Sequence, residues 1–105
     1  MDIVFNNKPD REQWWVAGLG DYLIWARLRV YSSGRAEVLS CDGDTRNYPD
    51  LDQAQAALLD AEFRAFDGMD EEDANSLGFS LEDVQPPEAD DDEDLVLSMT
   101  QRLRQ

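Results

Sequence analysis

The sequence predicts an α+β fold in which an antiparallel meander of three to four strands packs against one main helix. Stretches in the first half alternate apolar and polar residues with the period of two that is typical of strands. Short glycine-containing sequences typical of tight turns separate these stretches. After Pro49 the apolar residues instead recur three and four positions apart, as they do in an amphipathic helix.

The predicted meander has strands at residues 22–31, 35–41 and 45–48 and, in its four-stranded form, a short first strand at 13–17. The turns between them are GLGD at 18–21, SSG at 32–34 and the pair Asp42-Gly43. The second stretch, YLIWARLRVY, has the clearest alternation. It has aliphatic residues on one face and a mixture of aromatic and charged residues on the other. In the SSG loop we expect Gly34 to adopt the positive φ angle that a three-residue hairpin favours.

The main helix is predicted to span residues 51–66, with Asp50 as its N-cap and Gln53 three residues later. Its sheet-packing side consists of Leu51, Ala54, Leu58, Ala61 and Ala65. A second apolar stripe consists of Leu59, Phe63 and Phe66. This stripe needs its own cover, which the segment LGFSLEDV at 77–84 offers. Glu62 lies within the stripe, so we expect a buried charge paired with an arginine or tyrosine of the neighbouring layer.

A short acidic helix is predicted next, from an N-cap at Asp70 to Gly78 just beyond its end. We interpret residues 1–85 as a single α+β domain. Residues 86–94, PPEADDDED, are expected to be an acidic loop led by two prolines. Residues 95–105 form an amphipathic segment, either a helix or an edge strand, that docks back on the domain or onto a second copy in a homodimer.

The composition argues against catalysis. The chain has no histidine and one cysteine, Cys41, which excludes the usual general base near neutral pH, an internal disulfide and a cysteine-based zinc site. It has no GxxxxGK[ST] phosphate loop. The acidic stretch from Asp42 lacks the glycine and glutamate that a calcium-binding EF-hand loop requires at its sixth and twelfth positions. We therefore predict no catalytic residue, no metal site, no cofactor and no enzyme.

The sequence also bears on cellular location. No apolar stretch approaches the roughly 20 residues of a membrane span. The N-terminal sequence MDIVFNNKPD lacks the features of a signal peptide. Together with the single cysteine, these observations predict a reduced, cytoplasmic protein with no membrane partner.

The formal net charge of −15 is distributed unevenly along the 105 residues. Residues 1–46 carry seven acidic and six basic side chains, whereas residues 47–94 carry seventeen acidic side chains and only Arg64 as a base. Residues 95–105 carry two arginines and no acid. Such a field repels nucleic acid and attracts cations. We therefore predict a basic protein as the partner, with no direct binding of nucleic acid.

The predicted partner interface combines the densest acidic stretches with one tryptophan. It consists of Asp60, Asp67, Asp70, Glu71, Glu72, Asp73, Asp90, Asp91, Asp92, Glu93 and Trp14. Helix capping explains one or two of the acids at 70–73, but not the lack of bases from there through residue 94. Trp14 and Trp15 are adjacent in a predicted strand and so face opposite sides. One of them should be partly exposed, either at the edge of the core or as an anchor for a partner.

The order of meander, helix and short acidic helix includes the sequence YSSGRAEVLSCDGDTRNYPDLDQAQAALLDAEFRAF. This layout resembles small bacterial immunity proteins, the cytoplasmic inhibitors of polymorphic and contact-delivered toxins. The resemblance covers residues 20–85 and rests on size, acidity and layout. It implies stoichiometric binding that occludes the active site of a basic toxin. Two alternatives stay open: a nucleic-acid mimic that inhibits a DNA- or RNA-binding protein, and a small enzyme or ligand-binding domain that uses carboxylates.

Overall fold

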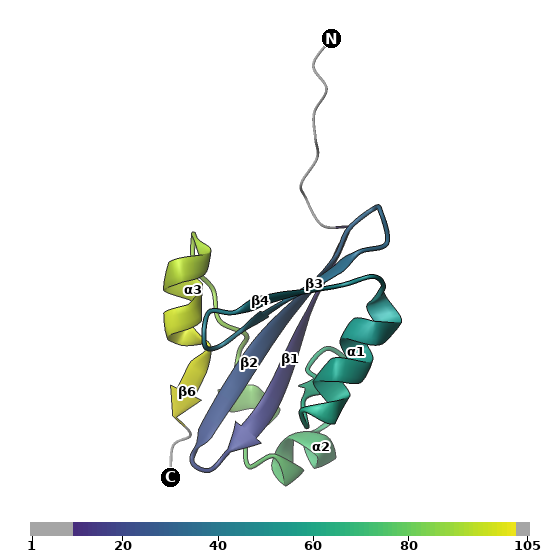
Figure 1. Ribbon diagram of the computed structural model, residues 1–105. Coiled ribbons are helices and arrows are strands. Elements are labelled where there is room, and N and C mark those ends of the chain that lie inside the picture. The colour runs from purple at the N-terminus through teal and green to yellow at the C-terminus, as the bar shows by residue number, and fades with distance from the viewer. Residues whose placement is uncertain (1–9, 103–105) are drawn as a thin grey trace.

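The computed structural model describes residues 10–102, and Figure 1 shows their arrangement. Residues 1–9 of the predicted domain and 103–105 of the predicted C-terminal segment lie outside the described residues. The strands are β1 (Arg11–Leu19), β2 (Tyr22–Val30), β3 (Ala36–Ser40), β4 (Thr45–Tyr48), β5 (Arg64–Ala65) and β6 (Thr100–Arg102). The helices are α1 (Leu51–Asp60), α2 (Glu71–Ser76), α3 (Asp92–Ser98) and the 3₁₀ turn η1 (Leu81–Asp83).

The strands form one antiparallel sheet in the order β4-β3-β2-β1-β5, which confirms the predicted α+β class and the meander. One edge of β2 pairs with β1 along its whole length. The other edge pairs with β3 along residues 26–30 and with β6 along residues 22–24. β5 is an addition to the predicted sheet, because a strand of two residues is too short to show alternation. β6 lies within residues 95–105, where an edge strand is one of the two predictions. β2 is the central strand, with neighbours along both edges.

The predicted turns and caps form as expected. Gly34 and Gly43 have φ angles of 92° and 91°, so both hairpins use the left-handed conformation that glycine allows. The side chain of Asp50 accepts a hydrogen bond from the amide of Gln53 at 2.8 Å and caps α1. Asp70 caps α2 in the same way, through the amide of Asp73 at 2.8 Å.

The sheet has a packed layer on each face (Figure 1). On one face, α1 covers a cluster of Trp15, Ala26, Leu28, Ala36, Val38, Ala54 and Leu58. On the other face, side chains from residues 66–99 cover the sheet. This second cluster contains Val16, Leu23, Trp25, Leu39, Ala74, Phe79, Val84, Leu95 and Met99. The face of β2 with mixed aromatic and charged residues is therefore interior, and Trp25 on it has no exposed surface.

The helix predicted over 51–66 is shorter, because α1 ends at Asp60. The amide of Phe63 donates to the carbonyl of Leu58 at 2.9 Å, and that of Glu62 donates to Leu59 at 3.0 Å. This pair of hydrogen bonds is the Schellman arrangement that ends helices. Phe63 then packs against the cluster that contains Leu58, as this motif favours. The chain reverses here and continues into β5.

The prediction that Glu62 is a buried charge is therefore wrong. Glu62 is exposed and has a φ angle of 69°, the left-handed conformation that the helix end requires at this position. The residues of the predicted second stripe do not lie together. Leu59 is 51% exposed, and Phe66 packs on the face of the sheet opposite α1. Segment 77–84 covers that opposite face of the sheet and not α1, since Phe79 and Val84 lie in the same cluster as Trp25.

The C-terminal segment is both a helix and a strand. α3 buries Leu95, and Met99 follows it with no exposed surface. β6 then pairs with β2, and the indole Nε1 of Trp25 donates to Gln101 Oε1 at 3.0 Å. The acidic loop predicted over 86–94 is shorter than expected, because its last three residues belong to α3. Pro87 within it is buried, so the segment packs despite its charge.

Replacing Glu62 by glycine should stabilise the protein. A residue with a side chain in the left-handed region costs about 1 kcal/mol, so E62G should raise the free energy of unfolding by up to about 1 kcal/mol. Urea denaturation measures this change.

Two controls belong to that experiment. Ala61 has a φ angle of −87°, so A61G should destabilise the protein. E62Q keeps the side chain without its charge and should change stability little. If E62Q stabilises the protein as much as E62G, charge and not backbone conformation is the cause.

Candidate protein-binding surface

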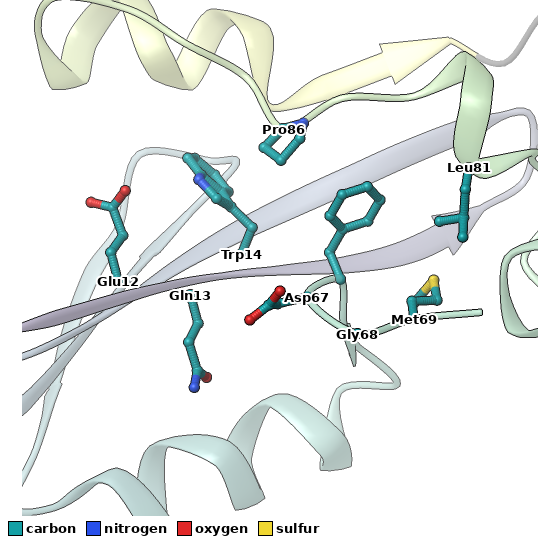
Figure 2. A pocket seen from close by; sticks show the side chains of 9 residues that line it. Glu12, Gln13, Trp14, Asp67, Gly68, Met69, Leu81 and Pro86 are labelled. Atoms are coloured by element: carbon teal, nitrogen blue, oxygen red, sulfur yellow. The ribbon is translucent and has the colours of Figure 1, made fainter.

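A groove opens beside β1, between the loop after β5 and the segment around η1 (Figure 2). Its volume is about 630 Å³. Its lining combines aromatic and aliphatic side chains with two carboxylates. The lining residues are Glu12, Gln13, Trp14, Phe66, Asp67, Gly68, Met69, Leu81 and Pro86. Trp14 and Asp67 are the two of these that belong to the predicted partner interface.

The aromatic side chains of the groove are held by the core below them. The Trp25 ring is fully buried and meets the Trp14 ring edge to face, with centroids 6.0 Å apart and planes at 87°. Phe66 packs on the same Trp25 ring, with centroids 5.0 Å apart. Trp14 itself is half-buried, whereas Trp15 is buried on the α1 face, as the alternation of side chains along a strand requires. This confirms the prediction that one of the two tryptophans is partly exposed.

Local hydrogen bonds place the loop 66–69, which forms one wall of the groove, beside Trp14. The amide of Phe66 donates to the carbonyl of Trp14 at 2.8 Å and continues the pairing of β5 with β1. A tight turn follows, in which Gly68 has a φ angle of 81° and the amide of Met69 donates to the carbonyl of Phe66. The turn places Asp67 at its exposed tip, on the rim of the groove (Figure 2).

The two carboxylates of the groove differ in their partners. Glu12 Oε2 accepts a hydrogen bond from Arg29 Nε at 2.8 Å, across the β1–β2 pair. Burial alone would lower the pKa of Arg29, but the hydrogen bond and charge of Glu12 raise it above the ordinary value. Asp67 has no ion-pair partner among residues 10–102. Asp67 is thus the carboxylate of the groove that is available to a cation from outside.

The predicted interface acids of α2 divide into structural and free groups. Asp70 caps the helix. Glu71 Oε1 accepts a hydrogen bond from the amide of Leu81 at 3.1 Å, which ties α2 to the groove wall. The side chains of Glu72 and Asp73 are exposed, and neither has a hydrogen-bond or ion-pair partner in the described part of the chain. These two lie in the first turn of α2, where the helix dipole favours negative charge, and their carboxylates are exposed to solvent.

The predicted interface acids at 90–93 lie at the start of α3, away from α2 (Figure 1). Asp91 caps α3 through the amide of Asp94 at 2.8 Å. Asp92 Oδ1 accepts a hydrogen bond from Arg27 NH1 at 2.9 Å, although its own side chain is 62% exposed. Asp90 and Glu93 are exposed. Of the remaining predicted acids, Asp60 is exposed at the last residue of α1.

Arg27 explains why Asp92 is not free. It lies on the interior face of β2 with 3% of its surface exposed, so its charge needs a nearby anion. The hydrogen bond from Arg27 lowers the pKa of the Asp92 carboxyl below its ordinary value. Arg27 Nε has no hydrogen-bond partner among the residues described. This ion pair ties α3 to the sheet, so Asp92 has a structural role.

The sequence prediction missed most residues of the groove, among them Phe66, Met69, Leu81 and Pro86. One signal for them exists: Asp67-Gly68 between Phe66 and Met69 is a turn sequence like those of the predicted hairpins. The other wall comes from a segment more than ten residues later and has no marker in the sequence. Only the tertiary packing brings the two walls together.

Among residues 10–102, no group of three or more cysteine, aspartate and glutamate side chains could hold a metal ion. The same part of the chain has no helix with the length and hydrophobicity needed to cross a membrane. Comparison of the chain with protein-family models, with curated proteins and with solved structures found no match.

The Arg27–Asp92 pair should make stability depend on pH at the acidic end. Because the folded state lowers the pKa of Asp92, the pair stabilises the protein above the ordinary aspartate pKa. Its contribution should be lost as the pH falls through the lowered pKa of Asp92. At neutral pH, D92N should reduce the free energy of unfolding by about 1–2 kcal/mol, since the bond is charge-assisted but partly solvated.

Urea denaturation of wild type and D92N, from about pH 7 to about pH 2.5, tests this expectation. The difference in the free energy of unfolding between wild type and D92N should become smaller as the pH falls. The adjacent E93Q variant is the matched control, because Glu93 is exposed and has no ion-pair partner in the described residues. A D92N difference that stays constant over this range would contradict the role of the ion pair.

Proposed function

We propose that this chain is a non-catalytic binding protein that captures a basic protein partner. The observation that carries the proposal is the groove beside β1, where a half-buried tryptophan and a phenylalanine are bordered by carboxylates. Partly exposed tryptophans in pockets are typical centres of binding energy in protein interfaces. Asp67, Glu72 and Asp73 supply the surrounding negative charge and have no described partner within the chain.

Charge and groove have different parts in the proposed capture. The acidic surface attracts a cationic partner over a distance and raises the association rate, toward about 10⁸–10⁹ M⁻¹s⁻¹ at low salt. The aromatic groove then slows dissociation, because anchors that exclude water hold a complex together. The aromatic side chains rest on Trp25 in the core, so little ordering of the site is needed on binding.

We further propose that the partner is a toxin and the chain its immunity protein, which blocks the toxin active site. The support is the resemblance in size, acidity and layout described above. A toxin that acts on nucleic acids or nucleotides presents positive charge to phosphate groups, and a negative inhibitor matches that surface. The probe for this proposal is a basic protein encoded by the gene beside this one. Calorimetric titration should give a one-to-one complex, and no binding would contradict the proposal.

The free carboxylates of α2 should control the association rate. We expect the double variant E72Q/D73N to associate with that neighbouring protein about tenfold more slowly at low salt, with little change in the dissociation rate. The difference in association rate between variant and wild type should be present at about 50 mM salt and lost by about 500 mM salt, because salt screens exposed charges. Stopped-flow fluorescence measures both rates.

The matched control is D21N/D52N, which removes the same charge from exposed residues in the β1–β2 turn and the first turn of α1. Equal slowing by both double variants would mean that only net charge matters. DNA competition gives a further result: a partner that keeps its DNA in the presence of saturating inhibitor argues against the nucleic-acid-mimic alternative.

A further inference from the structure

We infer that the groove beside β1 receives an arginine side chain of the partner. This inference rests on the proposed function, and it identifies which group of a basic protein would enter the site. Three properties of the groove lead to it: two aromatic rings held edge to face by Trp25, aliphatic walls, and one carboxylate without an ion-pair partner among residues 10–102.

The aromatic rings favour a cation. The faces of tryptophan and phenylalanine rings attract positive charge, and Trp14 is the stronger of the two in this respect. Edge-to-face contacts of Trp14 and Phe66 with Trp25 keep both rings in place. Figure 2 shows Trp14 extending from the sheet toward Pro86, and Phe66 lines the same groove.

The free carboxylate of Asp67 favours a ligand with positive charge. Asp67 lines the groove together with Trp14 and Phe66, and its side chain is exposed. Glu12, the other carboxylate of the lining, already forms an ion pair with Arg29, so these two charges offset each other. The net charge that the lining presents is therefore negative, and it comes from Asp67. An anionic or purely apolar group would leave this charge without compensation.

The walls distinguish arginine from lysine. Met69, Leu81 and Pro86 provide apolar surface for the long aliphatic part of a basic side chain. A guanidinium group is planar, stacks on aromatic rings and donates two parallel hydrogen bonds to one carboxylate. An ammonium group is more strongly hydrated and loses more on entering an aromatic groove. The combination of flat rings with one carboxylate therefore suits arginine better.

The test uses the full chain labelled with ¹⁵N and the blocked peptide acetyl-Gly-Arg-Gly-amide as the probe. NMR reports each tryptophan indole separately, and only Trp14 lines the groove. Addition of the peptide should shift the Trp14 indole signal in a saturable way. The same peptide with citrulline, which has the shape of arginine without its charge, should bind at least about threefold more weakly. The lysine peptide should also bind more weakly than the arginine peptide.

Two variants complete the experiment. D67N should weaken binding of the arginine peptide about threefold, the effect of losing one partly exposed ion pair. The control D52N removes an equal charge from the first turn of α1, outside the groove, and should leave binding unchanged.

Several results would overturn the inference. A citrulline peptide that binds as well as arginine would make the groove an apolar slot, and a lysine peptide that binds equally well would remove the selection for guanidinium. If the arginine peptide shifts the amides of Glu72 and Asp73 but not the Trp14 indole, the groove is not the site, although capture of basic proteins by the acidic surface would stand. Failure of the neighbouring protein to bind would count against the proposed function. It would leave the peptide result unchanged, because the peptide titration does not depend on that protein.

Discussion

The burial of β2 on both faces is the constraint on which the rest of the structure depends. Leu23, Trp25 and Arg27 point to one side of this strand, and Ala26 and Leu28 point to the other; all five are buried. A strand of this kind needs two covering layers. α1 supplies one layer, and residues 66–99 supply the other. Both edges of β2 are also paired, so its central residues 25–28 are enclosed on every side.

The burial of β2 on both faces explains where the acidic side chains lie in the segments that cover it. Residues after α1 contribute one apolar side chain per short element to the core, such as Ala74 in α2 and Leu95 in α3. The positions between these anchors face solvent, and acidic residues fill many of them. Some of these carboxylates stabilise the layer itself: Asp70 and Asp91 cap helices, and Glu71 bonds the main chain at Leu81. The segment 66–99 is thus a structural layer, and only part of its charge is free for binding.

Much of the fold follows from local patterns. Alternation predicts β1 to β4, and Asp50 and Asp70 mark the starts of α1 and α2 as N-caps should. The end of α1 is not predictable in this way, because Glu62 occupies a left-handed position where glycine is the usual signal. The cover of the Trp25 face is missed for another reason: its anchors lie in short helices and loops without a regular period. Trp14 is the part of the groove predicted from adjacent residues, whereas its opposite wall depends on long-range packing.

The pairing of β6 beside β2 has a consequence for how the molecule is assembled. The α1 face of the sheet is built from residues up to Ala65, so that half-core can consolidate early during synthesis on the ribosome. The hydrogen bond of the Trp25 indole cannot form until Gln101, 76 residues away, has been synthesised. The bond of Arg27 likewise requires Asp92, 65 residues away. Contacts of such long range slow folding. Until they form, a nascent chain exposes a tryptophan-rich surface and an open strand edge, the features that chaperones recognise and that promote misassembly.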